Sequence, residues 1–201
     1  MGGEQIEKES LELIEREIDF EGIPFEQKEI IKRVIHATAD PEFRYTMVFH
    51  PKAIAVAIDA LLKKKAILVD VKMLEAGISK NLSSDIEVIC YLDKVSTASG
   101  TMCEEAIRVA FFEKGQDIGI VAIGNSPTAL LSAIELFNVN KIKDKIIIGM
   151  PVGFIKALEA KIILSKQDFP FITNLSRKGG SAATAAVVNA LLKIVKNQKE
   201  G

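Results

Sequence analysis

Residues 118–130 read IGIVAIGNSPTAL, and this stretch decides the fold. Its first six residues are apolar or glycine without alternation, which is typical of a short strand buried on both faces. Gly124 then ends the strand. Ser126 or Asn125 can cap the helix that follows, and Pro127 suits the first turn of that helix. Because a buried strand that leads directly into a helix is the repeating unit of parallel sheets, the stretch predicts an α/β domain.

The same alternation of apolar runs and helical patterns covers most of the chain. Strands are expected at Ala66–Val69, Ile86–Leu92, Ile118–Ile123, Ile146–Ile148 and Phe171–Thr173. Helices are expected at Glu4–Glu17, from Pro24 to about His36–Asp40, and at Pro51–Lys64, Glu104–Phe112, Pro127–Phe137, Phe154–Leu164 and Ser181–Lys196. The predicted fold class is α/β, a three-layer α/β/α arrangement around a mostly parallel sheet with an N-terminal helical extension. We expect a single domain over residues 1–201, with the N-terminal helices in about 1–40 and a frayed tail at 196–201.

Composition and charge narrow the class of protein. Of the 201 residues, 48% are hydrophobic and 26% are charged, and the net charge of -1 argues against a general nucleic-acid binder. The polar start and the short apolar runs predict a cytoplasmic protein with no signal peptide and no contact with a membrane. Cys90, Cys103 and the two histidines form no zinc-type spacing, so we expect reduced structural thiols and no metal site.

Polar and glycine-rich segments follow four of the predicted strands. Asp70, after the first strand, either caps a helix or binds a polar ligand. Gly124–Thr128, Gly149–Gly153 and Ser176–Ser181 follow three others, and ligands of parallel sheets bind beyond such strand ends. Free N–H groups at helix starts, and Arg177 beside two glycines, suit a carboxylate or a phosphate. Each segment alone also fits ordinary helix capping or a surface loop, but three on one rim favour a large anionic small molecule. None is a Walker P-loop or a GxGxxG sequence.

His36 is the candidate acid–base residue. It ends an apolar helical pattern, beside Thr38 and Asp40, and histidine can donate or accept a proton near neutral pH. The alternative is a structural histidine that the helix dipole favours at a C-terminus. His50, before Pro51, is interpreted as a loop or capping residue.

Together, these motifs resemble the precorrin-8X methylmutases, also called cobalt-precorrin-8 methylmutases. The matching stretches are VIHATAD at 34–40, Asp70 with Met73, Gly77 and Ile78, EVIC at 87–90, AIGNSPTAL at 122–130, IGMPVGF at 148–154 with Glu159 and Lys161, and RKGGS at 177–181 with Asn189, Ala190 and Leu191. They run in order from about Ser10 to Leu192. AIGNSPTAL and IGMPVGF are the most specific of them.

The resemblance implies an isomerase of cobalamin (corrin) biosynthesis, a homodimer that acts on a tetrapyrrole. A methyl group would move from carbon eleven to carbon twelve of (cobalt-)precorrin-8, giving cobyrinic or hydrogenobyrinic acid, with no organic cofactor and no catalytic metal. The family's catalytic histidine falls on His36, whose implied role is proton donor to the macrocycle. Carboxylates on the rim of that substrate would explain several anion-binding loops on one cleft.

The resemblance and the loops together predict the substrate-binding residues. The family's binding serine falls on Ser10, and the hydroxyl that follows Gly77 and Ile78 falls on Ser79. The full predicted set is Ser10, Thr38, Asp70, Ser79, Thr101, Asn125, Thr128, Arg177, Lys178 and Ser181.

One position departs from the family pattern. The family usually has Thr-Arg-Ser before its middle helix, with the arginine facing the substrate, whereas this chain has Thr101, Met102 and Cys103. Losing such an arginine costs about 1–3 kcal/mol if nothing replaces it. Ser176 also stands where a glycine is usual. A non-catalytic or altered-specificity corrinoid-binding relative is therefore the alternative, and the sequence does not distinguish a cobalt-containing from a metal-free substrate.

Overall fold

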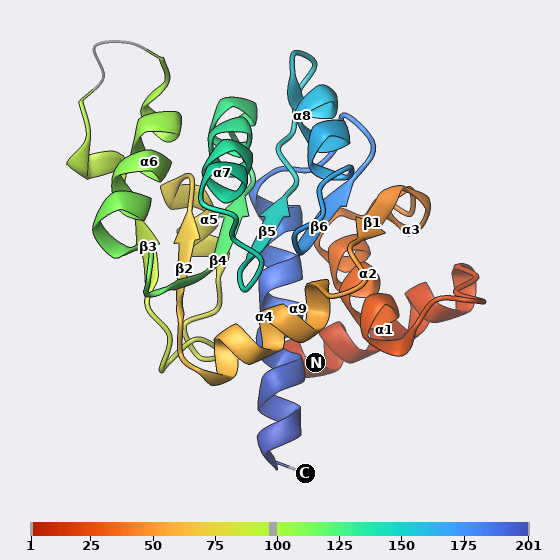
Figure 1. Cartoon of the computed structure of the whole chain (residues 1–201). Coiled ribbons are helices and arrows are strands. Elements are labelled where there is room, and N and C mark those ends of the chain that lie inside the picture. The colour runs from red at the N-terminus through yellow and green to blue at the C-terminus, as the bar shows by residue number, and fades with distance from the viewer. Residues whose placement is uncertain (1, 97–99, 201) are drawn as a thin grey trace.

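A mostly parallel sheet forms the centre of the protein (Figure 1). The computed structural model describes residues 2–96 and 100–200, and within them six strands lie in the order β1-β6-β5-β4-β2-β3. The strands are β1 (Met47–Phe49), β2 (Ala66–Val69), β3 (Val88–Cys90), β4 (Ile118–Ile123), β5 (Ile146–Gly149) and β6 (Phe171–Asn174). Only the β1–β6 pair among them is antiparallel. The predicted α/β class with a mostly parallel sheet is thus confirmed.

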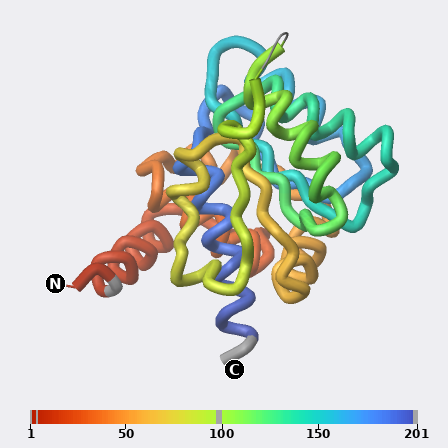
Figure 2. The backbone as a smooth tube through the Cα atoms, turned by 90° about the vertical axis from the view of Figure 1, so that its left-hand side faces the viewer, coloured from red at the N-terminus to blue at the C-terminus, as the bar shows by residue number. Residues whose placement is uncertain are grey.

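Helices cover both faces of this sheet. They are α1 (Gly3–Glu17), α2 (Phe25–Thr38), α3 (Phe43–Thr46), α4 (Ala53–Leu62), α5 (Lys72–Gly77), α6 (Met102–Lys114), α7 (Pro127–Val139), α8 (Ala157–Leu164) and α9 (Ser181–Glu200), with a 3-10 turn at Leu92–Lys94. Figure 1 shows α9 running behind the sheet, and Figure 2 shows α1 projecting from the body of the protein. The predicted three layers and the N-terminal helical extension are both present.

Strand β4 shows how the sequence builds the two cores. Ile120 and Ala122 pack into the core that contains α2, α4, α5 and α9, whereas Val121 and Ile123 pack into the core of α6, α7 and α8. Each fully buried isoleucine or valine contributes about 1.5–3 kcal/mol relative to exposure. The apolar run without alternation is therefore explained by burial on both faces.

Two predicted helix boundaries were wrong, and two short elements were missed. Strand β1 was not predicted, because its three half-buried residues form a strand only by pairing with β6. Helix α8 begins at Ala157 rather than Phe154, after Lys156 in a left-handed conformation (φ 60°). Helix α9 continues to Glu200, four residues beyond the predicted end. The short helix α5 was also missed.

Ion pairs attach α1 to the rest of the protein. Glu15 accepts hydrogen bonds from Lys28 and Lys32 of α2, both at 2.7 Å. These two bonds lower the pKa of Glu15 to about 2. Glu7 pairs with Arg33 of α2 at 2.8 Å and with Lys193 of α9 at 3.0 Å. These ion pairs, together with the packing of Ile14 against the core, thus fix the position of α1, which carries Ser10.

We predict that Glu15→Gln lowers the free energy of unfolding at pH 7 by no more than about 1 kcal/mol, because the Glu15 side chain that both lysines share is half-exposed. The pKa of Glu15 is lower in the folded state, so its contribution is complete above the ordinary value of 4.5 and is lost as pH falls toward about 2. Urea unfolding at several pH values between 7 and 2 measures this. Glu17→Gln, an exposed neighbour, is the control. An equal loss of stability in both variants would contradict the assignment.

Candidate functional site

A buried carboxylate occupies the place where the sheet changes its winding direction. Helix α5, after β2, packs on one face, and α7, after β4, packs on the other, so the loops after these neighbouring strands diverge. Such switch points are where open α/β sheets bind ligands. Asp70 lies there with a side chain that is 0% exposed. One carboxylate oxygen accepts the amide of Gly124 (3.1 Å), and the other accepts the amides of Asn125 (2.8 Å) and Ser126 (2.9 Å).

These bonds correct one prediction about the loop at 124–128. Its amides were expected to be free for an external anion, but those of Gly124, Asn125 and Ser126 already hold Asp70. Burial raises the pKa of Asp70, and the three amides oppose that rise. The residue therefore neither caps a helix nor exposes its carboxylate; it fixes the loop. The helix cap is Ser126, which accepts the amide of Ala129, and Pro127 stands in the first turn as expected.

Three hydroxyl groups meet beside this loop. The Oγ1 atoms of Thr101 and Thr128 are 2.7 Å apart, and the Oγ of Ser126 is 2.9 Å from that of Thr128. Thr101 also caps α6 by accepting the amide of Glu104. Asn125 is exposed next to them. Two separate helix starts thus place neutral donors and acceptors side by side at the carboxyl edge of the sheet.

The two glycine-rich loops are joined to each other. The amide of Gly180 donates to the carbonyl of Met150 (2.8 Å), and the amide of Gly153 donates to the carbonyl of Arg177 (3.1 Å). Gly179 has φ 144°, and a Cβ there would collide with the Met150 carbonyl, so this position requires glycine. The loops after β5 and β6 therefore form one continuous surface, which we call the wall and which consists of residues 149–153 and 176–181.

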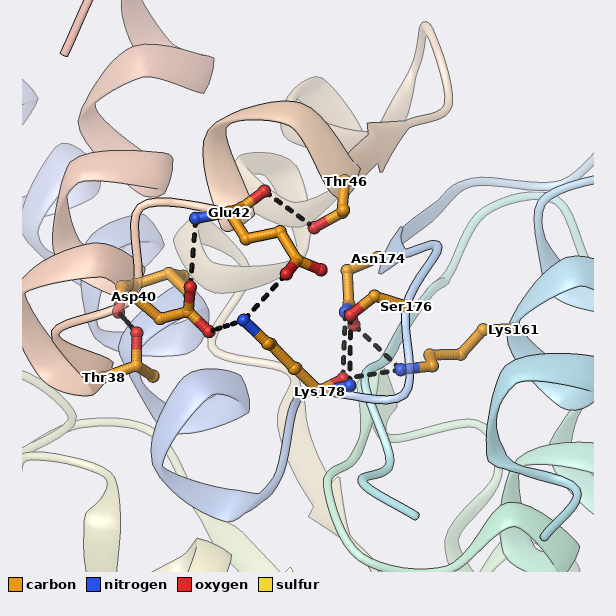
Figure 3. Close-up of polar contacts among 9 residues, drawn as sticks. Thr38, Asp40, Glu42, Thr46, Lys161, Asn174, Ser176 and Lys178 are labelled. Atoms are coloured by element: carbon orange, nitrogen blue, oxygen red, sulfur yellow. Dashed lines mark hydrogen bonds and ion pairs between the residues drawn. The ribbon is translucent and has the colours of Figure 1, made fainter. Parts of the chain in front are cut away.

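Arg177 and Lys178 in this wall have different surroundings. Arg177 is exposed, and its guanidinium lies over the ring of Phe154, 5.5 Å from the centroid. The ammonium of Lys178 pairs with Asp40 at 2.8 Å and with Glu42 at 2.7 Å (Figure 3). Burial acts to raise the pKa of Asp40, but the bonds from Lys178 and from the amide of Glu42 outweigh it, and the pKa is lowered. Lys178 thus connects the loop to the end of α2.

His36 lies exposed in the last turn of α2. Its Nδ1 is 2.7 Å from the Oγ of Ser10 on α1. A cavity of about 300 Å³ adjoins the ring and is lined also by Arg33, Gly77 and Asn189. Asn189 of α9 donates to the carbonyl of Gly77 (3.0 Å) and accepts the amide of Ser79 (2.9 Å). Helices α1, α2, α5 and α9 together form this part of the site.

Comparison with known proteins decides the family. The sequence profile described as precorrin-8X methylmutase matches residues 5–194. This chain belongs to the precorrin-8X methylmutase family. The cobalt-precorrin-8 methylmutase of Priestia megaterium is 41% identical over 94% of this chain and 86% of that protein, and that of Methanocaldococcus jannaschii is 40% identical over 87% and 84%. The precorrin-8x methyl mutase of Thermus thermophilus has the same fold, with a TM-score of 0.90 at 31% identity over 98% of each chain.

Among the predicted residues, Ser181 and Asn125 lie on adjoining segments. Ser181 begins α9 directly against Gly124, where a Cβ would approach the Ser181 Cα to 2.9 Å, so the loop after β4 and the RKGGS segment adjoin. Thr38, the last residue of α2, donates its hydroxyl to the carbonyl of Val34. Two larger hollows, of about 570 and 900 Å³, contain none of the predicted site residues.

Some residues of the site were not predicted as such. The chain after α5 is held by Asn189, and the loop after β6 is held by Lys161 and Asn174. Lys178 is held by Asp40 and Glu42. The sequence placed Asp40 in the matching VIHATAD stretch but gave it no role, because its partner lies 138 positions away at Lys178. Among the described residues, no group of three or more histidine, cysteine or acidic side chains could hold a metal ion. No described helix has the length and hydropathy to cross a bilayer.

We predict that Asp70→Asn lowers the free energy of unfolding by about 2–4 kcal/mol, because an amide offers one acceptor where the carboxylate offers two and places N–H groups against backbone donors. Chemical denaturation at pH 7 measures the change. Asp59→Asn, at an exposed residue paired with Lys63, is the matched control and should change stability by less than about 1 kcal/mol. Equal stability of the Asp70 variant and the wild type would show that the loop does not depend on this carboxylate.

Proposed function

We propose that this protein moves a methyl group from carbon eleven to carbon twelve of (cobalt-)precorrin-8, giving cobyrinic or hydrogenobyrinic acid, with His36 as the proton donor. The observation that carries the proposal is the pair of His36 and Ser10 beside a cavity that is lined by residues of α2, α5 and α9. The Nδ1 of His36 is engaged by the Ser10 hydroxyl, which orients the ring and leaves Nε2 for a ligand. Membership of the methylmutase family supplies the reaction class.

The reaction requires a general acid that donates a proton to the substrate and recovers it at the end. Donation from Nε2 of His36 to the conjugated macrocycle gives the ring positive character. The bond from carbon eleven to the methyl group then breaks as the bond to carbon twelve forms, and the methyl group takes its bonding electrons with it. Return of the proton to His36 completes an isomerisation with no change in composition. A positioned histidine supplies about 10²–10⁴-fold in such a step.

The remaining predicted residues would bind and orient the macrocycle. Arg177 is exposed on the wall, where its guanidinium suits a carboxylate. Neutral hydrogen-bonding groups would come from the other predicted residues, Ser10, Thr38, Ser79, Thr101, Asn125, Thr128 and Ser181. We assign indirect roles to Asp70, which holds the 124–126 loop, and to Lys178, which holds the end of α2. The cavity of about 300 Å³ is at the low end for small-molecule sites, so it would take part of the macrocycle.

Exposed apolar side chains after β5 and next to the β1–β6 pair support a homodimer. Phe154 is 83% exposed and Ile155 is 80% exposed, and Tyr45 and Leu175 are exposed as well. Tyr45 and Leu175 lie together because the amide of Leu175 donates to the carbonyl of Thr46. Exposed apolar patches on soluble proteins mark interaction surfaces. We propose that a second copy of the chain covers these apolar side chains.

We also propose that the protein is cytoplasmic and that it uses no organic cofactor and no catalytic metal. Cobalt, where present, belongs to the substrate.

We predict that Ile155→Glu converts the dimer into a monomer, because it places a charge in the apolar contact. Sedimentation velocity at matched concentrations measures the mass. Val139→Glu, at a residue of α7 that is 73% exposed, should leave the dimer intact. A monomeric wild type, or an unchanged mass for the Ile155 variant, would refute the proposed interface.

We predict that His36→Ala lowers the rate of methyl migration by at least about 10²-fold, while binding of the corrinoid product changes little. The assay follows the absorption spectrum of precorrin-8 or its cobalt form. His50→Ala, which removes the other histidine, is the matched control and should retain activity. An active His36 variant refutes the assigned role, and an inactive wild type beside a working relative refutes the reaction.

A second candidate function rests on Met102. This side chain is 47% exposed at the start of α6, next to the hydroxyl cluster, where the family usually has an arginine. A corrinoid-binding protein without turnover, or with altered specificity, would fit that loss of a cation. Tight binding of cobyrinic acid by a wild-type protein that forms no product would decide for this alternative.

A further inference from the structure

A lysine without an acidic partner lies beneath the wall that carries Arg177. Lys161 of α8 is 0% exposed. Its ammonium donates to the carbonyl of Lys178 (2.7 Å) and to the side-chain oxygen of Asn174 (3.2 Å), as Figure 3 shows. Within residues 2–96 and 100–200, no carboxylate forms an ion pair with it. Burying a charge without a counter-charge is costly, so a core-filling role alone does not explain a lysine here.

The partners of Lys161 fix the backbone on both sides of Arg177. Asn174 donates to the Ser176 hydroxyl (3.3 Å) and to the Lys178 carbonyl (2.9 Å). The amide of Lys178 donates to the same Ser176 hydroxyl at 3.1 Å. The carbonyl of Lys178 therefore accepts from both Lys161 and Asn174. Removal of the ammonium would leave this turn with one fewer anchor.

Charges around the turn do not neutralise Lys161. The ammonium of Lys178 is already compensated by Asp40 and Glu42. Arg177 adds a second positive charge on the exposed side, and on α8 itself Glu159 is exposed. A buried ammonium acts through a low dielectric, so its field at the exposed face of the turn is screened less than that of a surface lysine.

We propose that Lys161 is a positioning residue: it fixes the turn that presents Arg177, and its uncompensated charge strengthens binding of an anionic ligand group there. This inference rests on the proposed function in one respect, the identity of that group as a carboxylate of the corrin precursor. Lys161 of α8 would thus affect ligand binding without touching the ligand.

The charge of Lys161 gives the inference a pH signature. Burial lowers its pKa to about 8, from an ordinary value of 10.5. Between these values the unfolded chain binds the proton and the folded chain does not, so this group's contribution to stability rises with pH. Affinity for an anion should instead fall as pH passes 8. A lysine with only a structural role would not weaken binding over that range. The thiols of Cys90 and Cys103 have pKa values raised above the ordinary 9.0 and titrate higher.

The test compares wild type, Lys161→Met and Lys166→Met in two measurements. Lys166 is exposed just beyond α8 and is the matched control. The first measurement is the dissociation constant of cobyrinic acid between pH 7 and pH 9.5. The second is the rate of trypsin cleavage after Arg177 and Lys178, followed by mass spectrometry, which reports local opening of the turn.

We expect about tenfold weaker binding and faster cleavage for Lys161→Met, and no change for Lys166→Met. Wild-type affinity should fall several-fold above pH 8, and that fall should be absent from the Lys161 variant. Unchanged binding and cleavage would overturn the inference. If the variant does not fold, a flat wild-type affinity between pH 7 and 9.5 would overturn it. If wild type binds no corrinoid, the proposed function fails, and the cleavage rates still decide whether Lys161 holds the turn.

Discussion

The carboxylate of Asp70, buried between the ends of β2 and β4, is the interaction on which the site depends. Its two oxygens satisfy three consecutive amides that would otherwise lie unpaired at the switch point of the sheet. The path of residues 124–126 follows from these bonds, and with it the capping hydroxyl of Ser126 and the direction of α7. A place where many α/β proteins bind an external anion is thus filled by the chain's own carboxylate. Under the proposed function, a ligand anion would instead bind at the neighbouring wall.

Close approach of backbone segments then brings the wall to the switch point. Helix α9 begins so near Gly124 that a side chain there would collide with Ser181, and Gly179 lies against the carbonyl of Met150. The same helix carries Asn189, which holds the chain after α5 beside His36. One long helix therefore contributes to the loop after β4, to the wall and to the His36 cavity.

Paired charges explain how a nearly neutral protein can present a local cationic group. Lys178 is compensated by Asp40 and Glu42, and α1 is held by Glu7 and Glu15 through lysines and an arginine. Arg177 stays exposed on the wall above the buried ammonium of Lys161. A multiply charged ligand would meet this local potential rather than a broad basic field, in keeping with the net charge of -1.

The sequence by itself determined the layers of the fold, because apolar runs without alternation, such as residues 118–123, are stable only between two helical layers. It also determined a capped helix start at Asn125 or Ser126 and the family resemblance, because both are carried by short local motifs; the structure decided for Ser126. The tertiary structure alone decided that Asp70 faces the loop rather than a ligand, that Ser10 meets His36, and that Lys178 pairs with Asp40. It also decided strand β1, which exists only through its pairing with β6. Each of these contacts joins residues that are from 26 to more than 120 positions apart in the sequence. A local pattern of residue types does not encode which distant residue will become the partner, because that depends on how the helices and strands pack.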